Sequence, residues 1–404
     1  MVIIIGSGAG GGILALELSK NNIPVTIIEK GPFIDSKDAH NYYKIHSDDT
    51  DILKTECLGG TTTVSAGNGI RVLEKELESI GILIHEELDQ VDKLLSIHEM
   101  DVKHFGEGNK KFIESSKKLN MKPFKMPKFI RDKDCIPCGK CTFGCPKNAK
   151  WTSIDFIKKA MKKGANLLDN TEVLEIIVKD NIVKGVLVKN KNNQEETILS
   201  DIVISSAGAI NTAILLQKIG LPGGKKLFMD SFVTIGGIVK NIGFNKEVQM
   251  NSLIKGENYI LSPHYAQFIA NELKNKGAKE SDILSIMVKI PDDNYGQIKK
   301  GKVIKENSIK DIKFIAEGSA VAGAILIESG VVPESIVSTN LRGAHPGGTA
   351  AIGDLVDLNL ETSVKGLYVS DASVLPKSPG APPILTILAL SKRLSKHLIS
   401  IIKD

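Results

Sequence analysis

The sequence predicts an α/β fold that combines a Rossmann-like nucleotide-binding unit with a second, strand-rich region. Two observations lead to this class. The first is a strand, a glycine-rich turn, a helix and a second strand within the first 29 residues. The second is a series of short apolar segments between residues 221 and 335. A chain of 404 residues is long enough for two such regions, each with a hydrophobic core.

The N-terminal unit has the order of elements that binds a dinucleotide. Residues 2–5 are a β-branched apolar run, typical of a strand buried in a parallel sheet, and they lead into a G-x-G-x-x-G turn. A helical segment follows to about Lys20, and a strand at residues 24–28 ends at Glu29. The glycines let a pyrophosphate approach the helix N-terminus, and Glu29 would bind the adenosine ribose. This unit alone does not distinguish FAD from NAD.

The strand-rich region follows in the second half of the chain. Its strand-like segments are residues 232–239, 248–253, 284–290 and 298–304, and a helical segment is expected at 312–329.

The cysteines form the most specific motif of the chain. Four of the five lie within eleven residues, in the C-x2-C-x2-C-x3-C-P spacing of bacterial ferredoxins. They are Cys135, Cys138, Cys141 and Cys145. Thiolates are soft ligands that suit iron–sulfur chemistry. The motif therefore predicts a [4Fe-4S] cluster.

The fourth ligand of this cluster is open, because in two-cluster ferredoxins the last cysteine of the run serves the other cluster. Cys145 is the simplest choice, Cys57 is an alternative, and a three-iron cluster is a third possibility. Zinc or free thiols are less favoured, since structural zinc sites usually have two well-separated cysteine pairs. Disulfides are disfavoured in a chain that shows no secretory leader.

Composition argues against nucleic-acid and membrane partners. The net charge is only +5, with Lys and Glu interleaved rather than in blocks, which is typical of a solvated surface. No apolar window approaches the length of a membrane span. The first strand begins at Val2, which leaves no room for a leader peptide, so we expect a cytoplasmic protein.

Five further segments resemble the glucose–methanol–choline (GMC) family of FAD oxidoreductases. Leu58-Gly59-Gly60-Thr61-Thr62-Thr63-Val64 is similar to the loop that runs along the flavin, and His345-Pro346-Gly347-Gly348-Thr349 to the His-Pro-x-Gly-Thr segment. Residues 366–376 and 382–386 resemble the segments that close on FAD and begin the last helix. Residues 202–210 resemble the strand and turn that return to the adenine side.

The resemblance implies an FAD-binding domain interleaved with a smaller α+β substrate domain built on an antiparallel sheet. The FAD-binding domain would comprise residues 1–75, 151–220 and 336–404, with a substrate domain at 221–335. Residues 76–150 would be a helical insertion that carries the Cys-rich loop 135–146. The expected cofactor-binding residues are Gly6, Ser7, Gly8, Gly11, Glu29, Lys30, Gly59, Gly60, Thr61, Thr62, Val173, Ala207, Gly208, Asp371, Ala372, Pro383 and Thr386.

The resemblance also implies the chemistry: an alcohol loses its hydroxyl proton to a base and its carbinol hydride to flavin N5. His345 lies where the family places its active-site histidine, and an imidazole can take and release a proton near neutral pH. The family usually has a second polar residue, His or Asn, just before the last helix, where this chain has Pro382-Pro383. Ser378 is a possible substitute. The N-terminus of the last helix would favour the anionic reduced flavin.

Three functions follow from these features. The first is a dehydrogenase acting on CH–OH groups, in which the cluster passes electrons from the flavin to a one-electron acceptor such as ferredoxin. A few bacterial sugar dehydrogenases of the family are similar in this respect. The second is an oxygen-using alcohol oxidase with a structural Cys loop. The third is an electron-transfer subunit that docks on a partner enzyme and has no small-molecule substrate.

Overall fold

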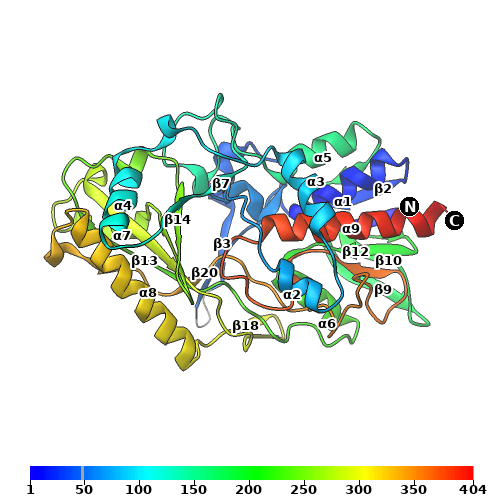
Figure 1. Ribbon diagram of the computed structural model, residues 1–404. Coiled ribbons are helices and arrows are strands. Elements are labelled where there is room, and N and C mark those ends of the chain that lie inside the picture. Colours follow the sequence, from blue (N-terminus) through cyan, green and yellow to red (C-terminus); the bar gives the residue numbers. More distant parts are fainter. Residues whose placement is uncertain (47–49, 404) are drawn as a thin grey trace.

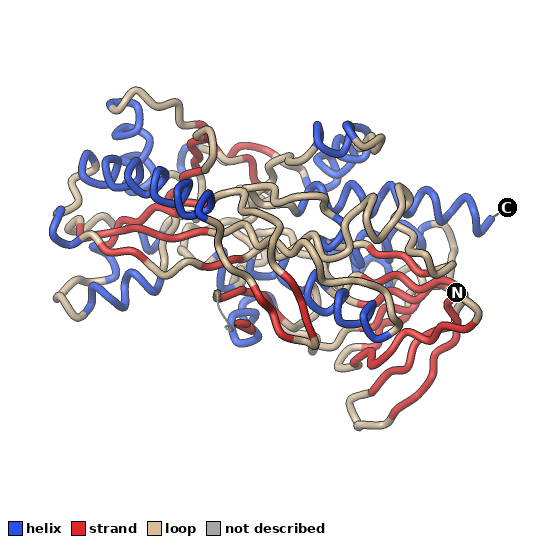
Figure 2. Tube along the Cα trace, turned by 90° about the horizontal axis from the view of Figure 1, so that it is seen from below, coloured by secondary structure: helices blue, strands red, loops and turns tan. Residues whose placement is uncertain are grey.

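The computed structural model describes residues 1–46 and 50–403. Two sheet systems lie side by side in an elongated molecule, and both termini are at the same end (Figure 1). The view of Figure 2 places the parallel sheet near the N-terminus and the larger sheet at the opposite end.

The smaller sheet is five-stranded and parallel, in the order β21-β12-β1-β2-β8. Its strands are β1 (Val2–Ile5), β2 (Val25–Ile28), β8 (Asn166–Leu168), β12 (Ile202–Ser205) and β21 (Leu367–Val369). The β-branched residues of β1 are all buried, as expected for a central strand covered on both faces. Helix α1 (Ala9–Lys20) packs against α5 (Ser153–Met161) and α9 (Ile384–Lys403). The α/β class predicted from the sequence is confirmed.

An antiparallel three-stranded sheet packs against β12. It consists of β9 (Glu172–Lys179), β10 (Ile182–Lys189) and β11 (Glu195–Leu199). Helix α6 (Gly208–Lys218) follows β12 and contacts β9. Helix α2 (Glu74–Ser79) is followed by α3 (His85–Leu95), which packs on α9.

The larger sheet has nine strands and is mostly antiparallel, in the order β3-β4-β20-β13-β16-β15-β14-β6, with β19 also paired to β13. The central strands are β13 (Phe232–Ile238), β16 (Ile283–Lys289), β15 (Ile260–Pro263) and β14 (Ser252–Lys255). Strands from outside residues 221–335 complete it: β3 (Tyr43–His46), β4 (Asp51–Thr55), β6 (Phe124–Lys125), β19 (Val337–Ser338) and β20 (Arg342–Gly343). The antiparallel sheet expected for the second region is therefore present, but it draws on distant parts of the chain.

Helices cover this larger sheet. Helix α8 (Ile309–Glu328) packs against β13 and β16, α7 (Gln267–Lys274) contacts β13, and α4 (Glu107–Lys118) contacts α8. A capping box begins α8, because Ser308 Oγ accepts from Asp311 N while Asp311 Oδ2 accepts from Ser308 N. The pair β5 (His98–Glu99) and β7 (Pro127–Lys128) leads into the Cys-rich loop.

Two strand predictions were wrong in detail. The strand expected at 248–253 begins only at Ser252, because Met250 adopts φ 52° and this left-handed conformation interrupts an extended run. The strand expected at 298–304 is a hairpin of β17 (Gln297–Lys299) and β18 (Lys302–Ile304). Its turn residues Lys300 and Gly301 both have positive φ, as a tight hairpin turn requires.

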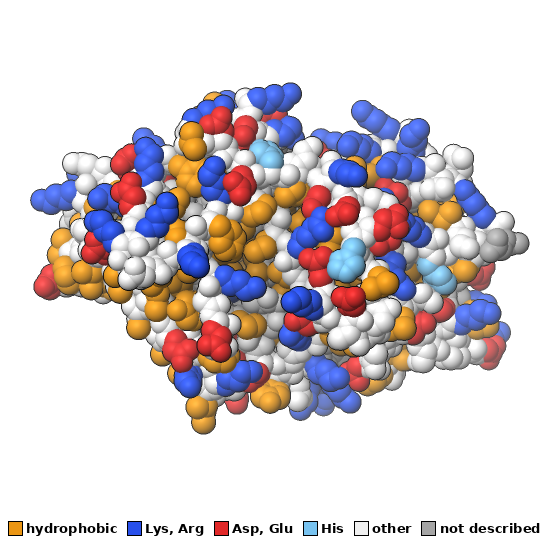
Figure 3. Space-filling model, in the orientation of Figure 1, with side chains coloured by type: hydrophobic (Ala, Val, Ile, Leu, Met, Phe, Trp, Pro, Cys, Tyr) orange, Lys and Arg blue, Asp and Glu red, His pale blue; other side chains and the backbone are white. Residues whose placement is uncertain are grey.

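Lys and Arg side chains alternate with Asp and Glu on the face shown in Figure 3. Within the described residues, no helix is long and apolar enough to cross a membrane.

Candidate active site and cysteine pocket

A cavity of about 850 Å³ lies between the two sheet systems. Its walls include the residues that follow four parallel strands at their carboxyl ends: Gly6 after β1, Glu29 after β2, Ser206 after β12 and Asp371 after β21. Ligands of open α/β sheets bind at this edge. The opposite wall comes from the larger sheet and includes Lys289 at the end of β16. The cavity volume is in the range of small-molecule and cofactor sites.

Most of the predicted cofactor residues meet at this cavity. Those that line it are Gly6, Ser7, Gly8, Glu29, Lys30, Gly60, Thr61, Thr62, Val173, Ala207, Gly208, Asp371, Ala372 and Pro383. A Cβ placed on Gly8 or on Gly208 would meet no protein atom within 4 Å, so bare backbone faces open space there. The N-terminus of α9 adjoins the same space through Pro383 and Ile384. This arrangement fits a dinucleotide whose phosphates approach the backbone.

Three predicted cofactor residues do not line the cavity. A Cβ on Gly11 would lie 2.0 Å from Gly6 O, so this glycine allows α1 to pack closely on β1. Gly59 has φ 87° and donates its N–H to Ser7 Oγ at 2.8 Å. Thr386 is fully buried and donates to Val72 O at 2.7 Å. All three contact other protein segments and not the cavity. Sequence spacing does not distinguish such residues from those that line the cavity.

Two buried carboxylates organise the cofactor end of the cavity. Glu29 Oε2 accepts from Ser7 N and Ser7 Oγ, at 3.0 and 2.6 Å, and Oε1 accepts from Gly31 N at 2.8 Å. Asp371 accepts from Gly208 N, Thr212 Oγ1 and Ser373, and so joins the end of β21 to the start of α6. Burial raises the pKa of both carboxyls, while these hydrogen bonds act in the opposite direction.

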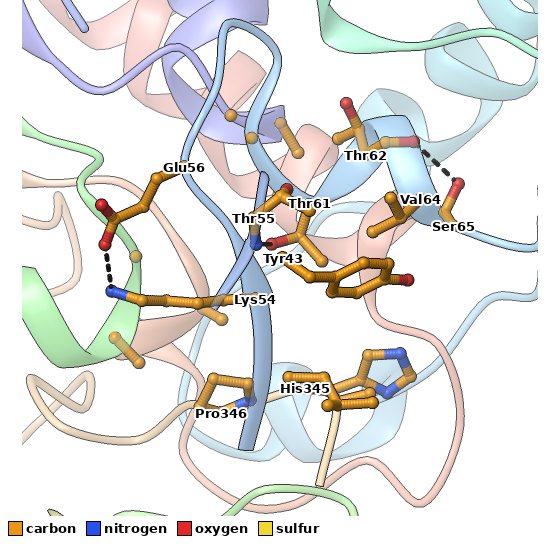
Figure 4. Close-up of a pocket in the computed structure, with 18 of the residues that line it drawn as sticks. Tyr43, Lys54, Thr55, Glu56, Thr61, Thr62, Val64, Ser65, His345 and Pro346 are labelled. Carbon is orange, nitrogen blue, oxygen red and sulfur yellow. Dashed lines mark hydrogen bonds and ion pairs between the residues drawn. The ribbon is translucent and has the colours of Figure 1, made fainter. Parts of the chain in front are cut away.

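His345 is held by a carboxylate that sequence analysis missed. Its Nδ1 lies 2.9 Å from Asp230 Oδ2, and Asp230 is fully buried. A carboxylate only accepts hydrogen bonds, so Nδ1 carries the hydrogen and Nε2 is left as the free base. No described residue bonds to Nε2. Tyr43 lies above the His345 ring in the same cavity (Figure 4), and its hydroxyl donates to Thr142 O at 2.6 Å.

Lys289 is the second residue of this site that was missed. Its side chain is buried, its Nζ donates to Asp230 O at 3.0 Å, and it lies 3.5 Å from His345 Nδ1. Burial lowers the pKa of His345 and the Lys289 cation lowers it further, whereas Asp230 raises it. Both missed residues are charged residues at the end of a mainly apolar segment. Asp230 follows Leu-Phe-Met, and Lys289 is the last residue of the buried strand β16. A charge in such a run is the signal that could have found them.

Ser378 does not replace the missing polar residue at Pro382. It does not line the cavity, and its Oγ lies 2.6 Å from Asp230 Oδ1 and 3.0 Å from Asp292 Oδ1. Gly380 N also donates to Asp230 Oδ1, at 2.9 Å. Asp292 in turn forms a buried ion pair with Lys305 at 3.0 Å. Ser378 therefore helps to fix the carboxylate that orients His345.

The four clustered cysteines line a second, smaller pocket of about 20 Å³, together with the apolar residues Ile130, Ala149 and Val248. Cys145 Sγ accepts from Ala149 N at 3.3 Å. Within the described residues, no three His, Cys, Asp or Glu side chains are arranged to hold a single metal ion. Cys57 is fully buried, contacts Thr63 Oγ1 and does not line this pocket.

The two pockets are neighbours along the chain. Cys141 lines the cysteine pocket, whereas the next two residues, Thr142 and Phe143, line the large cavity. One turn of 3-10 helix, Cys141–Phe143, thus forms part of both walls.

Two family models and proteins from other organisms match the chain. A family model described as GMC oxidoreductase matches residues 10–249, and a second model with the same description matches residues 308–391. An uncharacterised protein of Methanocaldococcus jannaschii is 34% identical over 409 residues, which cover 98% of this chain and 99% of that protein. A long-chain-alcohol oxidase of Arabidopsis thaliana is 21% identical, over 100% of this chain and 67% of the oxidase.

Solved structures share the fold. Pyridoxine 4-oxidase from Mesorbium loti superposes with a TM-score of 0.74 at 15% identity, covering 98% of each chain. Formate oxidase of Aspergillus oryzae also gives 0.74 at 15% identity, over 100% of this chain and 98% of the oxidase.

Proposed function

Since the chain belongs to the GMC oxidoreductase family, we propose that it is an FAD-dependent dehydrogenase acting on a CH–OH group. The observation that carries this proposal is the His345–Asp230 pair, which presents a neutral imidazole nitrogen at a cavity shaped for a dinucleotide. FAD is the cofactor that family membership supports, and the fourteen lining residues named above would hold it.

His345 acts as the base. With Nδ1–H donated to Asp230, Nε2 takes the hydroxyl proton of the substrate, and Asp230 stabilises the imidazolium that forms. FAD, when bound, supplies the acceptor for the hydride that leaves the carbinol carbon. The lowered pKa of His345 keeps the imidazole neutral, and thus ready to accept a proton, near neutral pH.

Lys289 takes the place of the second polar group that the family has before its last helix. Its ammonium lies beside His345 at the cavity wall, where Pro382 and Pro383 offer no side-chain donor. A buried cation stabilises negative charge on the substrate oxygen as the proton leaves. The departure at Pro382-Pro383 is then compensated from the larger sheet.

We further propose that the four clustered cysteines bind a [4Fe-4S] cluster that receives electrons from the flavin and passes them to a protein acceptor such as ferredoxin. The ferredoxin-type spacing, the shared pocket and the N–H bond to Cys145 Sγ support this. The shared segment Cys141–Phe143 also supports it, because it brings the two pockets to adjacent residues. The exclusion of Cys57 from the pocket favours Cys145 as the fourth ligand.

An oxygen-using oxidase is the second candidate, favoured by the oxidases among the similar proteins. Purification without oxygen, followed by iron analysis and an EPR spectrum before and after dithionite, separates the two. A fast-relaxing iron signal on reduction supports the relay. Iron-free protein that forms hydrogen peroxide as fast as it consumes substrate would identify an oxidase.

The base is tested by anaerobic flavin bleaching with a panel of alcohols. His345→Ala should lose bleaching while retaining FAD, whereas the exposed His40→Ala should bleach as the wild type does. Equal bleaching in the two variants would exclude His345 as the base.

A further inference from the structure

Two lysines are buried between the cysteine pocket and the large cavity. Lys150 is 3% exposed and lines the cysteine pocket, and its Nζ donates to Cys141 O at 2.9 Å and to Thr63 O at 2.9 Å. It also donates to Ser65 O, and Ser65 lines the large cavity. One side chain thus joins the cysteine loop to the segment that borders the cofactor space.

Lys128 lies beside it and is fully buried. Its Nζ donates to Ala66 O at 3.0 Å, Gln249 O at 2.7 Å and Asn68 Oδ1. Ala66 and Asn68 both line the large cavity. The two lysine side chains therefore lie in the protein layer between the cysteine pocket and the large cavity.

Neither lysine has an acidic partner. All six acceptors are neutral carbonyl or amide oxygens, and none of the described carboxylates lies within ion-pair distance of either Nζ. Lys305, by contrast, forms a buried ion pair with Asp292, and Lys289, which has no ion pair, lies near the charges of Asp230 and Asp292. A buried, unpaired cation is costly: burial lowers the pKa of both lysines, and an opposite charge nearby is what keeps such a group protonated.

Lys150 lines the same pocket as the four cysteines, which can supply this charge. Four thiolates around an iron–sulfur core carry a net negative charge, which grows by one unit when the cluster is reduced. Neutral thiols would supply none.

We propose that Lys128 and Lys150 form a cationic wall that balances the charge of the cysteine-bound cluster and favours its reduced state. This inference rests on the proposed cluster. An adjacent positive charge stabilises the more negative of two redox states, and hydrogen bonding and burial are known means of adjusting cluster potentials. The wall thereby makes the cluster a better acceptor for electrons that arrive from the flavin side.

The test is an EPR-monitored redox titration of the cluster in holoenzyme variants. Lys150→Met removes the charge and keeps the length of the side chain. We expect the ratio of reduced to oxidised cluster at a fixed ambient potential to fall at least tenfold, which is about 59 mV for a one-electron couple. Lys133→Met, an exposed lysine that does not line the cysteine pocket, is the matched control and should titrate as the wild type does.

A second variant guards against a folding defect. Lys128→Met should lower the ratio in the same direction, and its Nζ makes no contact with the cysteine loop. Normal iron content with an unchanged midpoint in the variants would overturn the inference and leave the relay intact. Absence of iron, or zinc in its place, in anaerobic wild-type protein would overturn the relay itself.

Discussion

Replacing Asp230 with asparagine tests how His345, the proposed base, is held. Asp230 Oδ1 accepts from Ser378 Oγ and Gly380 N, and Oδ2 faces His345 Nδ1. In Asp230→Asn the amide oxygen must stay with the two donors, so the NH2 group turns toward His345. An N–H facing Nδ1 makes this nitrogen an acceptor and moves the ring hydrogen to Nε2. The basic nitrogen of His345 then faces residue 230 and no longer faces the cavity.

The magnitude follows from what a general base contributes. Proton abstraction by a positioned side chain is worth a rate factor of about 10² to 10⁴. At 1.36 kcal/mol for each factor of ten, this is about 3–5 kcal/mol of activation free energy. We therefore expect flavin reduction to slow by about 10² to 10⁴ in Asp230→Asn, with FAD still bound because Asp230 does not line the cavity.

The pH profile should move in a defined direction. Burial and Lys289 lower the pKa of His345, and Asp230 alone raises it. Without the carboxylate the pKa falls further. A base works in its neutral form, so the rate rises as pH passes its pKa, and the onset of the residual rate should shift to lower pH.

The assay is anaerobic stopped-flow bleaching of FAD with an alcohol that the wild type oxidises. Glu247→Gln is the control, because Glu247 is a buried carboxylate that does not line the cavity. It accepts hydrogen bonds from Gly108 N and Asn109 N. A rate within threefold of the wild type in Asp230→Asn, or an onset shifted to higher pH, would refute the tautomer argument.

Three other outcomes are expected. Gly8→Ala should bind FAD at least tenfold more weakly but keep the wild-type melting temperature without FAD, because its Cβ meets no protein atom. Gly10→Ala is the contrast: its Cβ would lie 1.8 Å from Ser370 O, so the melting temperature should fall in the same thermal scan. Lys305→Met should lower the free energy of unfolding by about 3–5 kcal/mol in urea, because it leaves Asp292 buried without its cation. Burial already raises the pKa of Asp292, so this deficit should shrink as pH falls and the carboxyl takes up a proton; a pH-independent deficit would contradict this. Cys57→Ser should leave iron content unchanged, and a loss of iron would restore Cys57 as a ligand.

Local sequence predicted the strand, turn and helix that border the cavity because these elements are contiguous. The strand, glycine turn and helix of β1 and α1 are specified by neighbouring residues, and Glu29 follows within one βαβ unit. Short spacings also place the four clustered cysteines around one pocket, but within the described residues they form no group arranged to hold a metal ion. Gly11 and Thr386 show the limit of such predictions, because both pack against other parts of the protein and not against the cavity. Sequence spacing does not distinguish these two situations.

The surroundings of His345 depended on pairing between distant segments. His345, Asp230, Lys289 and Ser378 come from four separate parts of the chain and meet where the larger sheet adjoins the parallel one. No local pattern encodes such a meeting, because strand pairing and burial arise only when the sheets assemble. The sequence by itself determined the fold class, the dinucleotide turn and the ferredoxin-type cysteine spacing. Tertiary structure decided which carboxylate orients the histidine and which lysines are buried without a counter-charge, because both depend on which segments exclude water from one another.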